Sequence, residues 1–303
     1  MRTVREVGEF GLIERMRRRA RLAPSVVVGI GDDAAVLRGP GAGQRLLFAS
    51  DMVVEGVHFL RHRVSARWVG WKALACNVSD IAAMGGVPRW AVVSLGLPRG
   101  TPVRFVDELY AGLGRCARRY GVALVGGDTV RAPQVIVDVG ILGTVGPRRL
   151  TLRRGVRRGD ALFVTGRLGG SYRSGRHARF LPRLAEAHAL LRRVAVHAMI
   201  DLSDGLASDL WQMSRASGVT LRVEAAKIPV ARAGRTLDHA LMDGEDFELL
   251  FAVGAREAAQ VPRRLGRCPV TRIGTAVRRG VGVELVRRDG HISPLAPRGF
   301  RHF

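Results

Sequence analysis

Aspartates recur in this sequence at one kind of position, the end of an apolar run beside glycine or serine. They are Asp32 and Asp33 after SVVVGIG, Asp51 after LLFAS, Asp80 in NVSD, Asp128 after ALVGG, and Asp201 and Asp204 in MIDLSDG. Small neighbours let a ligand approach the backbone closely. Carboxylates gathered at one end of a sheet repel each other unless cations lie between them, and Mg²⁺ prefers a few carboxylates together with substrate phosphates. The pattern favours a metal–phosphate site over simple capping of turns and helices, the role we expect for Asp107, Asp138 and Asp160.

Common phosphate-binding motifs do not explain the glycines. Residues 29–34, GIGDDA, match the dinucleotide-binding pattern GxGxxA, with Asp51 roughly twenty residues further on. That pattern requires a helix next, whereas GPG at 39–41 breaks the chain, and Asp32 and Asp33 would repel a pyrophosphate. No GxxxxGK[ST], HRD, DFG or GxSxG occurs. Phosphate charge must therefore be met by metal, by backbone N–H groups in glycine turns and by arginine.

Helical and strand-like segments mix along the whole chain. Periodicity and capping signals predict helices over 8–20, 66–84, 102–120, 178–194 and 204–217. Apolar or β-branched runs predict strands at 25–30, 45–49, 90–97, 122–125, 134–145, 161–165, 198–201, 247–253, 270–277 and 283–286. Residues 146–160 are glycine-rich and basic, which marks a domain boundary. The sequence thus predicts an α+β protein of two domains, residues 1–148 and 149–303.

The net charge of +23 would suit a protein that binds nucleic acid, but other features of the sequence argue against such a partner. Of the 49 basic residues only Lys72 and Lys227 are lysines, the arginines are spread along the chain, and aromatic residues do not interleave with them. Neither lysine lies in a glycine-rich loop, so neither is expected to be catalytic. No apolar run approaches the ~18 residues of a membrane span. Cys76, Cys116 and Cys268 form no CxxC, so we expect free buried thiols in a cytoplasmic protein without a zinc site.

Seven segments taken together resemble one family. GIGDDAAV, SDMVVEGVHF, KALACNVSDIAAMGGVPRW, VGGDTV, IDLSDGLASDL, MDGEDFELLF and a terminal GFRHF resemble the thiamine-monophosphate kinases, in the family's order over nearly the whole chain. That family belongs to the superfamily of aminoimidazole ribonucleotide synthetase and selenophosphate synthetase. The resemblance implies a homodimer in which the N-terminal domains close a β-barrel, with a C-terminal α/β sandwich domain. It also implies transfer of the ATP γ-phosphoryl group to thiamine monophosphate with Mg²⁺, giving thiamine diphosphate.

The resemblance also implies the residues of the site. The Mg²⁺ ligands would be Asp33, Ser50, Asp51, Asp80, Asp128, Asp201 and Asp204. Contacts to ATP would come from Tyr110, Gly127, Asp128, Arg153 and Ser203, and contacts to thiamine monophosphate from His58, Glu245 and Phe300. No general base is assigned, because the acceptor phosphate is already largely dianionic near neutral pH, with its second pKa at about 6. Core packing stays open as the alternative for Tyr110 and Phe300, and Arg154 as a substitute for Arg153.

Two departures from the family pattern bear on specificity. Ala49 stands where the family usually has serine or threonine, and the segment from Gly170 to Asp201 is short, with SYRSGRHARF in place of an Ala-Gly-rich helix. Two other functions stay open: a related ATP-dependent enzyme resembling aminoimidazole ribonucleotide synthetase, and a catalytically silent basic binding module. Selenophosphate synthesis would need a reactive cysteine near the N-terminus, where the first cysteine is Cys76.

Overall fold

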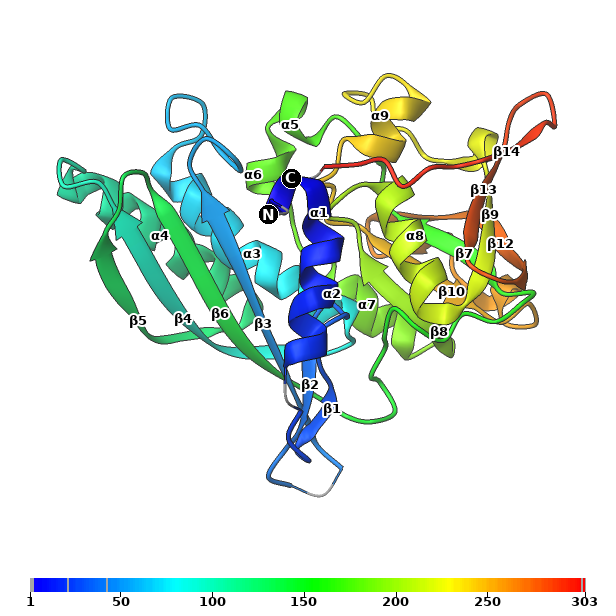
Figure 1. Cartoon of the computed structure of the whole chain (residues 1–303), viewed down its shortest axis with the longest axis horizontal. Coiled ribbons are helices and arrows are strands. Elements are labelled where there is room, and N and C mark those ends of the chain that lie inside the picture. The colour runs from blue at the N-terminus through cyan, green and yellow to red at the C-terminus, as the bar shows by residue number, and fades with distance from the viewer. Residues whose placement is uncertain (1–2, 21, 42, 301, 303) are drawn as a thin grey trace.

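Two mixed β-sheets form the framework of the molecule (Figure 1). The structure is a computed structural model that describes residues 3–20, 22–41, 43–300 and 302 of the 303-residue chain. One sheet is built from residues before 146 and the other from residues after 160, so the chain has two successive α+β halves. In the part of the chain that is described, no helix combines the length and apolarity needed to cross a membrane.

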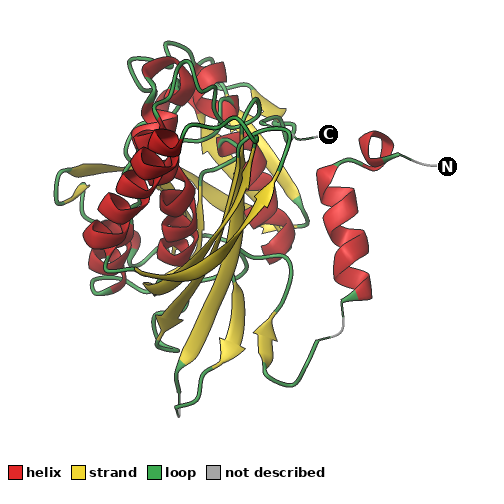
Figure 2. Ribbon diagram, turned by 90° about the vertical axis from the view of Figure 1, so that its left-hand side faces the viewer, coloured by secondary structure: helices red, strands yellow, loops and turns green. Residues whose placement is uncertain are grey.

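The N-terminal sheet has six strands in the order β1-β2-β3-β6-β4-β5 and is open within the described chain. Its strands are β1 (Val26–Val28), β2 (Ala35–Arg38), β3 (Arg45–Val54), β4 (Val87–Leu97), β5 (Ala123–Arg131) and β6 (Ile136–Val145). Only β4 and β5 pair in parallel, because α4 (Val103–Tyr120) makes the crossover between them. Side chains of β3, β4 and β6 alternate between a buried face and a face that no helix covers in Figure 2.

Helix α3 (Ala66–Ala83) is the central element of the fold. It contacts β3, β4 and β6, α4 beside it, and α6, α7 and β8 of the other half. Its residues are apolar or small almost all round, and nearly every one is buried, as expected of a helix inside a protein. Gly70 and Gly112 let α3 and α4 approach closely, since a Cβ at Gly112 would lie 1.8 Å from the carbonyl oxygen of Arg67.

The C-terminal sheet has the strand order β14-β13-β9-β12-β7-β10-β8, with β11 paired to β12. Its strands are β7 (Ala161–Thr165), β8 (Val196–Asp201), β9 (Val219–Glu224), β10 (Leu249–Val253), β11 (Arg264–Leu265), β12 (Cys268–Arg279), β13 (Gly282–Val286) and β14 (Ile292–Pro294). The helices of this half are α5 (Ser171–Ser174), α6 (Arg176–Arg179), α7 (Leu184–Leu191), α8 (Leu206–Ser217) and α9 (Leu237–Met242). Side chains of α8 and α9 share one core cluster with the sheet, and those of α7 share another with the end of α3.

The N-terminal helices α1 (Val4–Val7) and α2 (Glu9–Arg19) lie at the rim of the molecule (Figure 2). None of their described residues is fully buried. Figure 1 shows α2 standing between β3 and α8, so this helix lies over the junction of the two halves.

Several predicted boundaries differ from the structure. The strands predicted at 45–49 and 122–125 continue through Val54 and Arg131, so Asp51 and Asp128 lie within strands rather than after them. The helix predicted over 178–194 is divided into the end of α6 and α7, because Pro182 lies between them and favours extended backbone. Strand β9 and helix α9 were not predicted.

Candidate functional site

A cavity of about 340 Å³ lies at the junction of the two halves. Residues from β3, α3, the turn after β8, the loop before β10 and the C-terminal segment line it, and α2 lies at its edge. Of the aspartates that the sequence singled out, Asp51, Asp80, Asp201 and Asp204 line this cavity, and His58, Glu245 and Phe300 line it as well.

Three carboxylates from distant parts of the sequence converge beside the cavity. Asp33 precedes β2, Asp80 lies in the last turn of α3, and Asp201 ends β8. One oxygen of each lies within 4.8 Å of the other two. Ser79 donates a hydrogen bond of 2.5 Å to Asp201 Oδ2, which orients that carboxylate. Such an all-oxygen donor set fits Mg²⁺.

The surroundings of these carboxylates disfavour their ionised forms. Burial, followed by the neighbouring carboxylates, raises the pKa of Asp201 to about 8 and that of Asp51 to about 6. Burial and Asp51 raise the pKa of Asp80 as well. A divalent cation among these carboxylates would relieve their repulsion and restore the ionised forms. Asp33 Oδ2 is buried without a hydrogen-bond partner among the residues that the structure describes, so a coordination position is free for an ion.

Arg153 is the cation nearest the cluster. Its Nε and Nη2 donate to Asp33 Oδ1 at 2.9 and 2.6 Å, and its backbone N–H donates to Asp32 Oδ1 at 3.1 Å. Burial, followed by Asp33, raises the pKa of Asp32 to about 7. Arg153 therefore ties the first acidic loop to the start of the C-terminal half, with a guanidinium beside the carboxylates.

The turn after β8 adds further polar groups. Ser203 and Asp204 line the cavity, and burial raises the pKa of Asp204 to about 6. Asp209 on α8 is buried next to them, and burial raises its pKa. The sequence analysis missed Asp209, although its position five residues after Asp204 in SDGLASD could have indicated it.

Lys72 reaches the cavity from inside α3, which the sequence analysis did not anticipate. Its side chain is 1% exposed, and its Nζ donates to the His58 carbonyl oxygen at 2.9 Å and to the Glu245 carboxylate. A lysine assigned to a helix thus joins two residues that were predicted to bind substrate. Glu245 and Phe247 hold positive φ angles of 52° and 49°, so this loop is strained where it meets the ion pair.

Aromatic rings close the same side of the cavity. The Phe300 side chain is 40% exposed, and its ring centroid lies 6.4 Å from that of His58. His302, also missed by the sequence analysis, lies 5.2 Å from His58 and 4.8 Å from Phe300. Burial and Lys72 lower the pKa of His58 to about 4, so this imidazole is neutral near pH 7.

Other predicted site residues lie elsewhere in the single chain. Ser50 Oγ donates to Asp138 Oδ1 at 2.9 Å, on the face of the sheet opposite to Asp51. Asp128 is on that same face, because it pairs with Ser94, which pairs with Asp138. Gly127 precedes it in β5, where a Cβ would lie 1.8 Å from the Val93 carbonyl oxygen. Tyr110 is exposed on α4, away from the residues that line the cavity.

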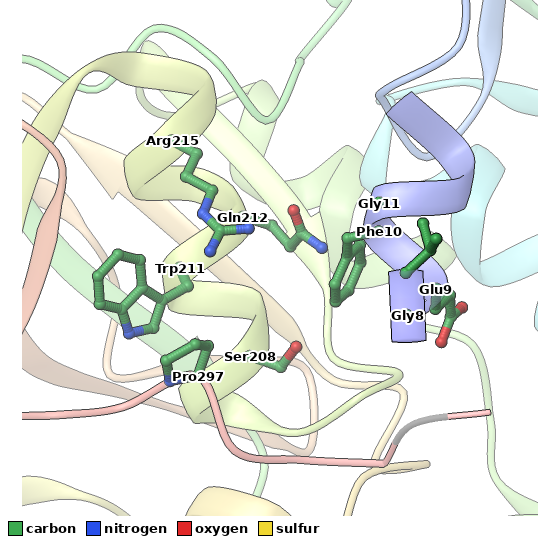
Figure 3. A pocket seen from close by; sticks show the side chains of 10 residues that line it. Gly8, Glu9, Phe10, Gly11, Ser208, Trp211, Gln212, Arg215 and Pro297 are labelled. Carbon is green, nitrogen blue, oxygen red and sulfur yellow. The ribbon is translucent and has the colours of Figure 1, made fainter. Parts of the chain in front are cut away.

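A smaller groove of about 190 Å³ adjoins the site between α2 and α8 (Figure 3). Phe10 of α2 extends toward Gln212 of α8, and both residues also line the main cavity. Trp211, Arg215 and Pro297 form the other wall, and the indole N–H of Trp211 donates to the Leu295 carbonyl oxygen at 2.6 Å. The groove continues the cavity toward the N-terminal helix.

Comparison with known proteins gives full-length matches. Residues 31–145 match the AIR synthase related protein, N-terminal domain, and residues 157–286 match the AIR synthase related protein, C-terminal domain. A thiamine-monophosphate kinase of Rhodopirellula baltica is 40% identical over 311 residues, 97% of each chain, and one of Bacillus subtilis is 32% identical over 326 residues, 97% of this chain and 99% of that one. A solved structure described as AaThiL complexed with AMPPCP and TMP superposes with a TM-score of 0.85 at 31% identity, over 100% of this chain and 99% of that one.

Proposed function

The chain belongs to the thiamine-monophosphate kinase family of AIR synthase related proteins, and from this membership we propose how its residues carry out the reaction. The protein is an ATP-dependent kinase that phosphorylates thiamine monophosphate to thiamine diphosphate. Full-length kinase relatives and the likeness to a structure with an ATP analogue support this function. The observation that carries our proposal for the site is the convergence of Asp33, Asp80 and Asp201 at one cavity.

We propose that Asp33, Asp51, Asp80 and Asp201 hold Mg²⁺ beside the polyphosphate, with Asp204 at the rim. Bound Mg²⁺ supplies positive charge that offsets the charge of two crowded phosphate groups. The carboxylates fix where that charge lies, because Asp80 and Asp201 are held on a helix and a strand of the two halves. Ser50 and Asp128 stay predicted ligands.

Arg153 is proposed to contact ATP from within the cluster, and to release Asp33 when a phosphate group takes the place of that carboxylate. Ser203, Gly127 and Asp128 remain predicted ATP contacts, with Tyr110 beside the adenine. No side chain is needed as a general base, because the acceptor phosphate is largely dianionic near neutral pH, with its second pKa at about 6. The task of the protein is in-line positioning and charge neutralisation.

The acceptor is proposed to lie between His58, Glu245 and Phe300. Glu245 accepts a hydrogen bond from the amino group of the pyrimidine, and Phe300 offers an aromatic face to the cationic thiazolium, a contact worth about 0.5–2 kcal/mol. The neutral His58 ring can donate to the phosphate without carrying charge. Lys72 fixes the distance between the His58 backbone and Glu245.

We propose that the uncovered face of the N-terminal sheet pairs with a second copy of the chain, closing the barrel that the family resemblance implies. Phe48 and Met52 of β3, Trp90 and Val92 of β4 and Val130 of β5 are exposed on this face, which is unusual for large apolar side chains in one sheet. The boundary between domains is proposed at residues 148 and 149, and the protein is proposed to act in the cytoplasm.

The reaction is tested by following ATP consumption with thiamine monophosphate as acceptor. We expect one ADP per thiamine diphosphate formed, and no turnover after Mg²⁺ is removed with EDTA. Asp80→Asn should lower kcat by orders of magnitude, whereas the exposed Asp107→Asn should leave it unchanged. Turnover with formylglycinamidine ribonucleotide and none with thiamine monophosphate would instead favour an activity resembling that of aminoimidazole ribonucleotide synthetase.

A further inference from the structure

A second cavity, of about 510 Å³, lies between the start of α3 and the short helices α5 and α6. Arg63 and Trp68 line it on one side, and Tyr172, Arg173 and Arg179 on the other. None of its lining residues lines the cavity beside the aspartates. The α5–α6 segment that lines it holds SYRSGRHARF, the stretch in which the sequence analysis noted a departure from the family pattern.

The lining of this cavity is positively charged without compensation. No aspartate or glutamate lines it in the described ranges of the chain. Arg173 forms no hydrogen bond or ion pair within those ranges, and Arg63 has only a long contact of 3.4 Å to the Tyr172 hydroxyl, with its guanidinium 6.0 Å from that ring. Arg179 donates to the carbonyl oxygens of Gly175 and Ser174. By contrast, Arg153, Arg176 and Arg183 all pair with buried carboxylates.

The N-terminus of α3 adds a second source of positive potential. Ser65 lines the cavity and is the N-cap of this 18-residue helix, yet its side chain forms no capping hydrogen bond. The first turn holds no acidic residue. The first N–H groups of a helix that lack partners, together with the helix dipole, favour a bound anion.

His177 is an independent sign of a missing ligand. This residue also lines the cavity and is only 4% exposed, and its Nε2 has no partner in the described part of the chain. Its Nδ1 lies 3.3 Å from the Ser171 carbonyl oxygen, which can only accept, so Nδ1 carries a proton. Burial, followed by Lys72, lowers the pKa of His177, so the ring is neutral and its buried Nε2 offers a lone pair that a protonated phosphate oxygen can satisfy.

We propose that this cavity is a binding site for the phosphate group of a small phosphate compound, held by Arg63, Arg173 and the first N–H groups of α3. The rings of Trp68 and Tyr172 line the same cavity and can contact an aromatic ring carried by that phosphate. The proposal does not depend on the kinase reaction, since the two cavities share no lining residue.

Calorimetric titration of the full chain in EDTA without nucleotide tests the site, because EDTA abolishes phosphate binding through metal at the aspartates. Inorganic phosphate and phenyl phosphate are the probes. Saturable binding of one molecule per chain is expected for both. Tighter binding of phenyl phosphate supports a ring-bearing ligand, and equal binding supports free phosphate. Absence of saturable binding for both probes overturns the proposal.

Variants locate the binding. The double variant R63Q/R173Q should weaken affinity by about tenfold or more, because it removes two charge-assisted contacts. Ser65→Asp should weaken affinity similarly by placing a carboxylate in the site, and it should fold, because aspartate is as good an N-cap as serine. R232Q/R256Q removes the same charge from two exposed positions outside the cavity and should bind as the wild type does. Equal weakening in this control would show nonspecific attraction and overturn the site.

Discussion

The buried carboxylates beside the cavity make the stability of the metal-free protein depend on pH. In the folded state the pKa of Asp51 is raised to about 6, that of Asp32 to about 7 and that of Asp201 to about 8, whereas aspartate ionises near 4 in an unfolded chain. Between those values the folded state holds more protons than the unfolded state. The free energy of unfolding in EDTA should therefore be greatest near pH 4 and fall as the pH rises toward 8.

Urea unfolding at several pH values, with EDTA or with saturating Mg²⁺, measures this effect. With Mg²⁺ the cation takes the place of the protons, so the free energy of unfolding should be nearly flat above pH 5. Asp201→Asn should reduce the slope in EDTA by up to about 1.4 kcal/mol per pH unit, the value for one proton. Equal slopes with and without Mg²⁺ would contradict the assignment of these carboxylates to a metal site.

Lys72 gives a second test at this scale, because the chain has only one other lysine to serve as its control. Lys72→Met removes a buried cation from between the His58 carbonyl and Glu245, so we expect the KM for thiamine monophosphate to rise about tenfold with a smaller change in kcat. Glu245 keeps partial access to water, so the loss of stability should stay at about 1–3 kcal/mol. Lys227→Met, on an exposed 3₁₀ turn, should change neither constant. A fall in kcat at constant KM would place Lys72 in the transition state rather than in substrate positioning.

Some residues of the site could be predicted from the sequence, and others could not. Asp33, Asp80 and Asp201 were predicted because small neighbours distinguish them from solvated acids, and the structure brings them together. Lys72 was not predicted as part of the site, since its partner Glu245 lies 173 positions away and only the tertiary fold places them in contact. Asp128 was predicted from the same pattern and Ser50 by resemblance, and the single chain does not bring them to the cluster.

Among the secondary-structure elements, strand ends were the least predictable feature. The apolar run at 161–165 predicted β7 correctly, because this central strand is buried along its length. β3 extends past its apolar run because residues Ser50–Val54 find hydrogen-bonding partners in β6, which the sequence of β3 alone cannot reveal. The sequence did not predict β9, because Thr220, Arg222 and Glu224 interrupt its apolar residues. The segment forms a strand because it pairs with β12 and β13 on its two sides.

The packing of α3 against α4 can be tested with two glycines of one helix. Gly112→Ala should destabilise the protein by about 3 kcal/mol or more, because the new Cβ would lie 1.8 Å from the Arg67 carbonyl oxygen. Gly114→Ala meets only the flexible end of Arg118, so it should stabilise the protein by up to about 1 kcal/mol through helix propensity. Thermal unfolding of both variants measures the difference. A similar Tm for the two would mean that α3 and α4 can move apart freely.

For the whole molecule, the uncovered face of the N-terminal sheet predicts self-association. Trp90 is 46% exposed on this face, so Trp90→Glu should convert a dimer into a monomer with its fold intact. Light scattering after size-exclusion chromatography measures the mass. Val103→Glu, at a residue 76% exposed at the start of α4, is the control and should stay dimeric. A wild-type protein that is monomeric at micromolar concentration would refute the proposed barrel.

The spacing of three residues on helix α3 limits how this sequence can change in related proteins. Lys72, Cys76 and Asp80 all line the cavity at intervals of four residues, so one face of one helix carries both the lysine that pairs with Glu245 and a proposed ligand of the metal site. Inserting or deleting a single residue between them would turn one by about 100° relative to the other. Related sequences can therefore change in this segment by substitution but not by insertion or deletion. A search for distant relatives should keep the spacing K-x₃-C-x₃-D and allow small residues at the middle position.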